Sequence, residues 1–353
     1  MMAAIAFAVG ASLVANAFAD PRVMIESTYT GKKGLNDLAK DLGKYMGTAI
    51  DIKQLSDKCQ AGVLKDTKEF GMITPANSMT WDAIEAKRGV FTFEDADTIV
   101  AFAKKAGAQV RCSTLICHKQ VPEWVQKLEK AELLEAMSNY ITKVMTHFGS
   151  SCLIWDVVSE AFEEDGSYRQ SFWYKKAGMD YIFTAFKTAN TVTQKLGLKN
   201  RLYYSDYNIS VINNKSDAVL KMVTSLRRKK LWVEGLSAQS HYLASEWVAG
   251  AHIFNNFRRF TSIKMDVAIT ELDVRTSSAN PNVTEQQQQV SVYANVMSAC
   301  KKTVRCVGVT TWNFVDSYSW TKSSASLPYS QPNGPNTPLV RKATYDAIAD
   351  GWI

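Results

Sequence analysis

Short runs of apolar and β-branched residues recur along the chain, and longer stretches with a helical spacing of apolar positions lie between them. Apolar runs without polar interruption are typical of parallel strands that are buried on both faces. We expect strands at residues 45–50, 70–74, 109–116, 152–158, 201–204, 235–240, 265–270 and 307–312. We expect helices at residues 94–106, 130–148, 173–196, 216–229 and 285–300.

The alternation of eight strands with helices predicts the fold class. Strands that are separated by helices form a parallel sheet, and eight such units close into an α/β barrel. The 353 residues, of which 46% are hydrophobic, suit one barrel with insertions. We therefore expect a single (β/α)8 TIM barrel over residues 20–353, in which the Ser-, Pro- and Asn-rich stretch 321–338 is a surface loop.

The N-terminal stretch 1–19 is apolar, rich in small residues and uncharged. It ends in Ala17-Phe18-Ala19, which resembles a signal-peptidase site, although the usual basic segment is missing. We expect residues 1–19 to be a signal peptide and the protein to be secreted and extracellular; a buried N-terminal helix is the alternative. Elsewhere the sequence predicts no membrane-spanning helix, so we expect no membrane partner.

The net charge of +7 and the run Arg227-Arg228-Lys229-Lys230 would suit a nucleic-acid partner. The run follows a stretch with helical apolar periodicity, however, and is better interpreted as the solvated end of a helix. We expect no nucleic-acid partner and a monomeric protein.

The six cysteines fit an oxidising compartment. Their spacing contains no CxxC motif of the kind that binds zinc, so we expect no metal and no cofactor. Cys112 and Cys117 fall on opposite faces of one predicted strand and cannot easily pair. The residues alone leave the partners of Cys59, Cys112, Cys117 and Cys152 open.

Two of the predicted strands end in a carboxylate. Glu160 follows the strand at 152–158, and Glu271 follows the strand at 265–270. In an α/β barrel, the carboxyl ends of the strands meet at the face that carries the active site. A buried carboxylate without a partner is costly, so we interpret both glutamates as functional. Two such carboxylates predict a hydrolase of the paired-carboxylate type.

Aromatic, amide and imidazole side chains gather at the same strand ends. Sugar rings stack on aromatic faces, and their hydroxyl groups need directional hydrogen bonds, so this combination predicts a carbohydrate-binding cleft. Trp155 lies inside a strand and is interpreted as a core residue. The residues expected to contact the substrate are Asn77, Trp81, His118, Gln120, Ser159, Tyr207, Asn208, Gln239, Trp312 and Trp320.

From about residue 38 to the C-terminus, the chain resembles glycoside hydrolase family 10, a secreted (β/α)8 family best known for endo-β-1,4-xylanases. The matching motifs include Phe70-Gly71-Met72-Ile73-Thr74-Pro75, Trp155-Asp156-Val157-Val158, Asp206-Tyr207-Asn208, Gln239-Ser240-His241 and Thr270-Glu271-Leu272-Asp273.

The resemblance implies a role for each residue of the catalytic centre. Glu160 is expected to be the general acid/base and Glu271 the nucleophile of a retaining enzyme, whose carboxyl groups lie roughly 5–5.5 Å apart. His241 would hydrogen-bond the nucleophile, and Asp273 would support it. The resemblance also implies a disulfide bond between Cys300 and Cys306.

Five positions depart from the family pattern toward smaller side chains. Ala76 and Thr80 stand where the family has Glu and Lys, Ser113 and Cys117 where it has His and Trp, and Ser159 where it has Asn. In xylanases, most of these groups hold the glycone part of xylan. Losing a donor that acts in the transition state costs about 2.7–4 kcal/mol. We therefore expect poor activity on ordinary xylan and an enlarged glycone pocket at Ala76, Thr80, Ser113 and Cys117.

Three functions are compatible with these residues. The preferred one is a retaining, endo-acting β-glycosidase that releases an oligosaccharide from a glycoalkaloid such as α-tomatine, as the fungal tomatinases of the family do. The alternative is an endo-β-1,4-xylanase with compensating contacts. The third is a non-catalytic carbohydrate-binding protein, which would have no need for the buried carboxylates Glu160 and Glu271. The sequence leaves the true glycone and aglycone open.

Overall fold

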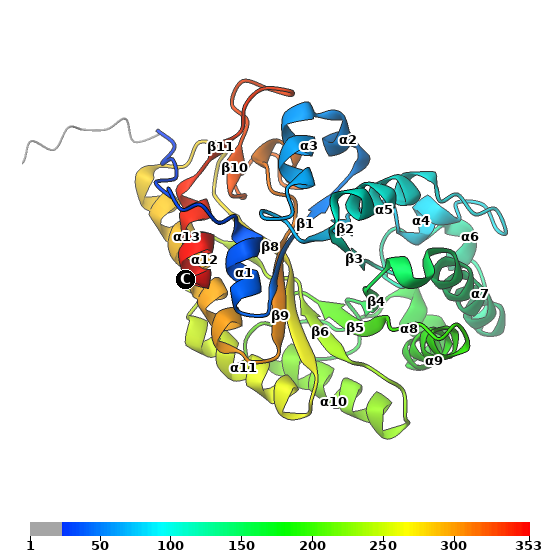
Figure 1. Cartoon of the computed structure of the whole chain (residues 1–353). Helices are drawn as coiled ribbons and strands as arrows, with labels where there is room; N and C mark the ends of the chain where they lie inside the picture. The colour runs from blue at the N-terminus through cyan, green and yellow to red at the C-terminus, as the bar shows by residue number, and fades with distance from the viewer. Residues whose placement is uncertain (1–22) are drawn as a thin grey trace, which may run out of the picture.

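Eight parallel strands close into a barrel in the computed structural model, which describes residues 23–353 (Figure 1). Each strand pairs in parallel with the next, and the last pairs with the first. The barrel strands are β1 (Tyr45–Ile50), β2 (Met72–Pro75), β3 (Gln109–Cys112), β4 (Ile154–Ser159), β5 (Arg201–Asp206), β6 (Gly235–Ala238), β8 (Asp266–Arg275) and β9 (Cys306–Thr311). The expected TIM barrel is confirmed; the predicted signal peptide at 1–19 lies outside the described residues.

Helices surround the strands on the outside of the barrel (Figure 1). The longer ones are α5 (Glu94–Ala106), α7 (Lys130–Phe148), α9 (Asp180–Lys195), α10 (Asn214–Arg228), α11 (Gly250–Ser262), α12 (Val283–Lys302) and α13 (Ala343–Trp352). The shorter ones are α1 (Leu35–Asp41), α2 (Ile52–Ser56), α3 (Lys58–Lys65), α4 (Trp81–Ile84), α6 (Glu123–Gln126) and α8 (Phe172–Ala177).

Local signals account for where several helices begin and end. Helix α5 has acidic residues in its first turn, and it ends at Gly107, whose φ of 83° makes a left-handed cap. The side chain of Asn282 accepts a hydrogen bond from the backbone N–H of Glu285 and so caps the start of α12. The single helix predicted at 173–196 is split into α8 and α9 at Gly178, which has a φ of 56°. Helix α11 was not among the predicted helices.

The strands are buried, as their unbroken apolar runs indicate, and every residue of β1 and β4 is buried. The barrel interior nevertheless holds an ion pair, in which the guanidinium of Arg111 donates to both oxygens of Asp156 at 2.9 and 2.6 Å. The Arg111 guanidinium also lies over the ring of Tyr203. Gly235 leaves the space that this ring fills, because a Cβ atom there would overlap the Tyr203 ring.

The segment 321–338 is partly buried, and the expectation of a surface loop is wrong for its middle part, residues 324–329. Leu327 is fully buried, and its backbone N–H donates to Asp316. The strand β10 (Tyr329–Ser330) pairs antiparallel with β11 (Val340–Arg341). Composition indicated a loop because Ser, Pro and Asn dominate the segment, but its few large apolar side chains pack against the barrel.

Two disulfide bonds are present among the described residues. Cys300 pairs with Cys306, as the family resemblance implied, and Cys112 pairs with Cys152, a pairing that the residues alone left open. Cys112 ends β3 and Cys152 lies just before the neighbouring strand β4, so their Cα atoms are 5.7 Å apart. The free cysteines in this part of the chain are Cys59 and Cys117.

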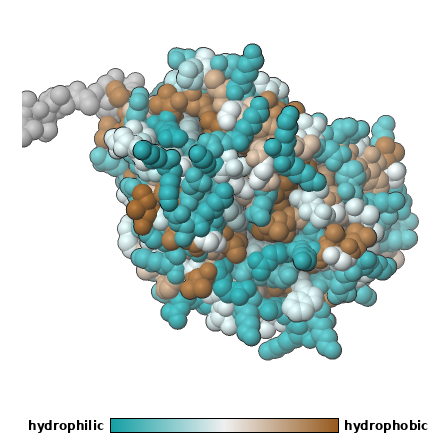
Figure 2. Space-filling model, in the orientation of Figure 1, coloured by the Kyte–Doolittle hydropathy of each residue, from teal (hydrophilic) through white to brown (hydrophobic). Residues whose placement is uncertain are grey.

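The surface is largely polar, and Figure 2 shows hydrophilic side chains over most of one face, with hydrophobic ones scattered between them. The basic run 227–230 lies at the end of α10 and is mostly exposed, which confirms its interpretation as a solvated helix end. Within residues 23–353, none of the helices combines the length and apolarity that crossing a bilayer requires.

Candidate active site

The polar side chains singled out from the sequence meet at the carboxyl ends of the strands. The backbone is unusual there, because several residues other than glycine adopt the left-handed conformation at strand ends or in the loops that follow. Such residues cluster at functional sites, where the surrounding fold holds them in place. They are Gln120, Glu160, Asn208, Ser240 and Asn313, with φ between 54° and 69°.

Glu271 and Asp273 both contact the imidazole of His241. They are two residues apart on β8 and therefore point to the same side of that strand. His241 begins the short strand β7 (His241–Leu243), which pairs with β8 in a register that places His241 opposite Asp273. The imidazole Nε2 lies 3.2 Å from Glu271 Oε2, and Nδ1 lies 2.7 Å from Asp273 Oδ2. The indole N–H of Trp320 donates to the same Asp273 oxygen at 2.7 Å.

The two carboxylates keep His241 charged. Burial alone would lower the pKa of His241, but Asp273 and Glu271 outweigh it and raise the pKa to about 10. Burial raises the pKa of Glu271, and the neighbouring imidazolium opposes that rise. Glu271 therefore depends on the positive charge of His241 to stay ionised in its buried position.

Gln239 connects the two glutamates of the site. Its side-chain amide donates to Glu160 Oε1 at 3.1 Å, and its backbone carbonyl accepts a hydrogen bond from the N–H of Glu271 at 2.9 Å. The backbone N–H of Glu160 donates to the carbonyl of Ser205 at the end of β5. The fold thus brings together carboxyl groups from the ends of β4 and β8, two strands that are not adjacent, and Gln239, which follows β6, contacts both glutamates.

His118 and Cys117 face the other oxygen of Glu160. Nδ1 of His118 lies 3.5 Å from Glu160 Oε2 and 3.9 Å from the sulfur of Cys117. Burial lowers the pKa of His118, although the charge of Glu160 opposes this, so the imidazole is neutral at neutral pH. Burial also raises the pKa of the Cys117 thiol, to about 12.

A buried lysine supports the end of β5. Lys215 is fully buried at the start of α10, and its ammonium lies 3.1 Å from Asp206 and 3.1 Å from Glu164. It also lies over the ring of Tyr207, 3.3 Å from the ring centre. Burial raises the pKa of Asp206 to about 7, against the lowering effects of Lys215 and of the Tyr204 hydroxyl.

Arg169 ties the Glu160 loop to Tyr207. Its Nε donates to the carbonyl of Glu160 at 2.8 Å, and its terminal NH2 donates to the Tyr207 hydroxyl at 2.7 Å. Sequence reasoning identified neither Arg169 nor Lys215. Both lie several residues beyond a strand, where isolated basic residues are usually solvated and no local pattern marks them.

Most of the residues predicted to contact a sugar are accessible at this face. Asn77 and Gln120 are exposed and joined by a hydrogen bond of 2.9 Å, and Tyr207 and Trp312 are half-buried. The prediction that Trp81 contacts a sugar is wrong. Its side chain is buried and stacks on Tyr140 with ring centres 4.1 Å apart, so it cannot reach a ligand.

The positions at which this chain has smaller side chains than the family pattern are largely buried. Ala76, Thr80, Ser113 and Ser159 are each less than 9% exposed, and only Cys117 is half-buried. The hydroxyl of Thr80 is engaged with the Asn77 carbonyl and with Asp82. An enlarged glycone pocket above these residues stays a prediction.

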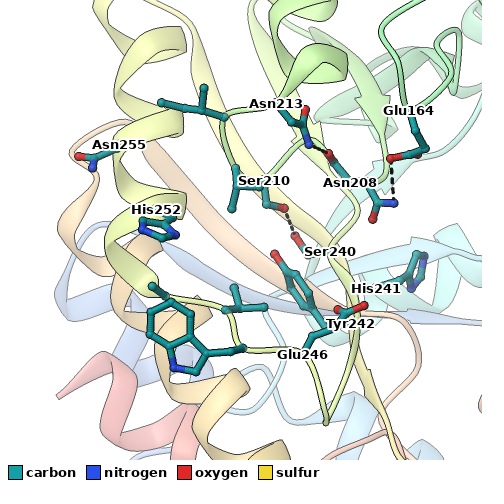
Figure 3. Close-up of a pocket in the computed structure, with 15 residues that line it drawn as sticks. Glu164, Asn208, Ser210, Asn213, Ser240, His241, Tyr242, Glu246, His252 and Asn255 are labelled. Atoms are coloured by element: carbon teal, nitrogen blue, oxygen red, sulfur yellow. Dashed lines mark hydrogen bonds between the residues drawn. The ribbon is translucent and has the colours of Figure 1, made fainter.

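A cavity of about 660 Å³ opens beside His241 and extends along the loops after β5 and β7 (Figure 3). Asn208, His241 and Tyr242 are among its lining residues, and the side-chain amide of Asn208 donates to Glu164 at 3.2 Å. Ile212 and Trp247 also line the cavity and are 56% and 81% exposed. Sequence reasoning did not identify Ile212 or Trp247, since a single exposed apolar residue carries no signal of its own.

Comparison with known proteins decides the family. The model of glycosyl hydrolase family 10 matches residues 34–351. The chain belongs to this family. The endo-1,4-beta-xylanase of Agaricus bisporus is 36% identical over 333 residues, which cover 92% of this chain and 96% of the relative. The endo-1,4-beta-xylanase A of Phanerodontia chrysosporium is also 36% identical, over 92% of this chain and 78% of the relative.

Solved family 10 structures share the fold closely. The crystal structure of a GH10 xylanase from Bispora sp. MEY-1 with xylobiose has a TM-score of 0.88 and 36% identity, and the match covers 90% of this chain and 99% of that one. The Penicillium canescens endo-1,4-beta-xylanase XylE has a TM-score of 0.84 at 34% identity, over 90% and 97% of the two chains. As a member of family 10, the protein is a retaining glycoside hydrolase that acts on O-glycosyl bonds.

Proposed function

We propose that the protein is an endo-1,4-β-xylanase in which Glu160 is the general acid/base and Glu271 is the nucleophile. The observation that carries the proposal is that Gln239 contacts both glutamates, whereas only Glu271 also contacts His241, which in turn contacts Asp273. Relatives that share nearly the full length of this chain are named endo-1,4-beta-xylanases, which supports xylan as the substrate class.

The two glutamates have different surroundings, and these suit different steps. Glu271 faces the imidazolium of His241, which keeps it ionised for attack on the anomeric carbon. Glu160 is placed to donate a proton to the glycosidic oxygen as the bond to the leaving sugar breaks and the bond to Glu271 forms. Glu160 then takes a proton from water, and that water releases the sugar from Glu271 with its configuration retained.

Contacts to the sugar come from the accessible residues around the pair. We propose that Asn77, Gln120, His118 and Gln239 hydrogen-bond the sugar hydroxyls on one side of the cleaved bond. Trp312 and Trp320 would provide aromatic faces for the rings. Tyr207 and Asn208 would contact the sugar on the leaving side, next to the cavity shown in Figure 3.

Product analysis on xylan tests the proposal. We expect short xylo-oligosaccharides, and we expect the β-anomer to appear first in proton NMR spectra taken during hydrolysis. Glu271→Gln should lower kcat on every substrate by at least about a thousandfold, or about 4 kcal/mol in barrier height. Glu160→Ala should spare the first step on an activated aryl glycoside, and azide should restore the second. Full activity of the Glu271→Gln protein would rule out this mechanism.

A glycoalkaloid such as α-tomatine is a second candidate substrate, and the cavity beside His241 favours it. An apolar aglycone could lie on Tyr242 and against the exposed Ile212 and Trp247, and the small residues at Ala76 and Ser159 suit a branched sugar. The kcat/KM values for xylan and α-tomatine decide between the two. A tenfold advantage corresponds to about 1.4 kcal/mol in transition-state binding. If xylan leads by that margin, the tomatinase-like function is wrong.

We also propose that the protein acts outside the cell. The two disulfide bonds agree with an oxidising compartment. N-terminal sequencing of protein recovered from the culture medium should begin at Asp20. A chain that is retained in the cell with its first nineteen residues intact would contradict the signal peptide.

A further inference from the structure

A thiol, an imidazole and a carboxylate converge beside Glu160. The sulfur of Cys117, Nδ1 of His118 and a carboxylate oxygen of Glu160 all lie within 4.8 Å of one another. The His118–Glu160 separation of 3.5 Å is longer than a normal hydrogen bond, so these two groups face each other without being bonded. Cysteine spacing along the chain did not predict this cluster, because its third member comes from a different strand.

The backbone holds the three groups in this arrangement. Ile116 and Val158 form a parallel bridge, so Cys117, one residue after Ile116, lies close to Glu160, two residues after Val158. The carbonyl of Cys117 accepts a hydrogen bond of 2.8 Å from the indole of Trp173. Gln239 occupies Oε1 of Glu160 and thereby leaves Oε2 turned toward His118.

The spacing of the three atoms fits a tetrahedral zinc ion. Zinc binds sulfur at about 2.3 Å and nitrogen or oxygen at about 2.0–2.1 Å, so neighbouring ligand atoms lie about 3.3–3.6 Å apart. The sulfur–Nδ1 distance of 3.9 Å and the Nδ1–Oε2 distance of 3.5 Å need to shorten by only a few tenths of an ångström, and the sulfur and the carboxylate oxygen, which lie within 4.8 Å of each other, would have to approach by up to about 1.3 Å. We propose that Cys117, His118 and Glu160 form a binding site for Zn²⁺ or a similar thiophilic divalent cation, with water in the fourth position.

The donor set selects the type of cation. Thiolate and imidazole ligands favour zinc over Mg²⁺ and Ca²⁺, which prefer oxygen ligands. The other histidine of the site, His241, has carboxylates on both ring nitrogens. Charges around the Cys117 site act in both directions, since Lys119 and Arg169 oppose a cation, and Glu163 favours it.

Metal binding would inhibit the enzyme. The sulfur–hydrogen bond of Cys117 breaks, its proton passes to solvent, and a sulfur–metal bond forms. Glu160 binds as the carboxylate, so the proton that it would donate to a glycosidic oxygen passes to solvent as well. Glu160 then donates an electron pair to the metal and cannot protonate a glycosidic oxygen. The inhibition rests on the proposed acid/base role of Glu160, whereas the metal site itself does not.

Titration of the chelator-treated protein with Co²⁺ tests the site without any substrate. We expect one Co²⁺ per chain, with the absorption of a sulfur-to-cobalt charge transfer, and displacement by Zn²⁺ but not by Mg²⁺ or Ca²⁺. Cys117→Ser should abolish the absorption and weaken Zn²⁺ binding by at least about a hundredfold, since even the loss of a residue behind a ligand costs 10–100-fold. His118→Asn should weaken it similarly. Cys59→Ser, which removes the other free cysteine, should bind as the parent protein does.

Two results would overturn the site: no thiol-dependent cobalt absorption in the parent protein, or equal Zn²⁺ affinity in the parent and the Cys117→Ser protein. Activity is measured separately. Zn²⁺ should inhibit the parent and the Cys59→Ser protein but leave the residual activity of the Cys117→Ser protein unaffected at the same concentration. A parent protein that binds one Co²⁺ through Cys117 and keeps full activity with Zn²⁺ bound would support the site and contradict the acid/base role of Glu160.

Discussion

At the scale of single residues, the proposed function depends on how the negative charge of the Glu271 carboxylate is stabilised in a largely buried environment. The side chain of Glu271 is largely buried, with 12% of it exposed, and this burial by itself raises the pKa and disfavours the ionised form that a nucleophile needs. His241 reverses this cost because Asp273 keeps the imidazole positively charged. In the proposed mechanism, the histidine is therefore a positioning residue that acts through the carboxylate of Glu271.

Replacement of His241 should shift the acidic limb of the pH profile. In His241→Asn, the cation that opposes the raised pKa of Glu271 is missing, so that pKa rises further and more of the carboxylate is protonated at a given acidic pH. The acidic limb of kcat/KM should move upward by at least about one pH unit, which corresponds to a loss of about 1.4 kcal/mol of interaction. His147→Gln, a change on the surface of α7, should leave the limb in place. A shift to lower pH would contradict the role of His241.

At the scale of elements, strand register decides which side chains meet. The pairing of β7 with β8 sets His241 opposite Asp273, and the bridge between Ile116 and Val158 sets Cys117 beside Glu160. The disulfide between Cys112 and Cys152 joins the same pair of strands, β3 and β4, below the site. This bond spans 40 residues, whereas the bond between Cys300 and Cys306 spans 6.

Removal of the two disulfides should destabilise the protein to different extents. In the chain-entropy model, a 40-residue loop corresponds to about 4 kcal/mol and a 6-residue loop to about 2 kcal/mol. The double variant Cys112→Ala with Cys152→Ala should therefore lose about twice as much free energy of unfolding as Cys300→Ala with Cys306→Ala. Denaturant unfolding of the three proteins measures this difference. An equal loss in both double variants would show that loop length does not set the contribution.

At the scale of the whole molecule, the N-terminal segment of the described chain packs against the C-terminal helix α13. The segment before α1 runs beside α13 (Figure 1), where Ser27 and Thr28 bind the carboxylate of Asp346. Helix α13 packs against α12 and α1 and buries Tyr345, Ile348 and Trp352. The last ten or so residues thus belong to the core and are not an appendage.

Replacement of a buried tryptophan in α13 should show how much this helix contributes to the free energy of unfolding. Trp352→Ala removes a side chain that is 2% exposed and should cost about 3–5 kcal/mol of unfolding free energy. Trp247→Ala removes one that is 81% exposed and should change it by less than about 0.5 kcal/mol. Thermal and denaturant unfolding of both variants provide the comparison. A small loss for Trp352→Ala would mean that α13 adds little to the stability of the barrel.

Tertiary packing explains where prediction from the sequence failed. Trp81 follows a strand like the other cleft residues, yet it turns inward and stacks on Tyr140, which is far away in the sequence. Lys215 has no local pattern that distinguishes it from a solvated lysine, although it is fully buried between two carboxylates. Whether such side chains turn inward depends on the elements that pack against them. These elements come from distant parts of the chain, so the residues next to Trp81 or Lys215 in the sequence do not indicate them.

The amino-acid sequence by itself determined the barrel and the positions of its two catalytic candidates. Local periodicity predicts the buried parallel strands and their helices, and Glu160 and Glu271 lie where apolar runs end. Only the tertiary structure decided which atoms meet. The pairing of Cys112 with Cys152, the contact of His241 with Asp273 and the approach of Cys117 to Glu160 each depend on the register of two strands. Register is set by packing between distant segments, so no stretch of sequence contains it.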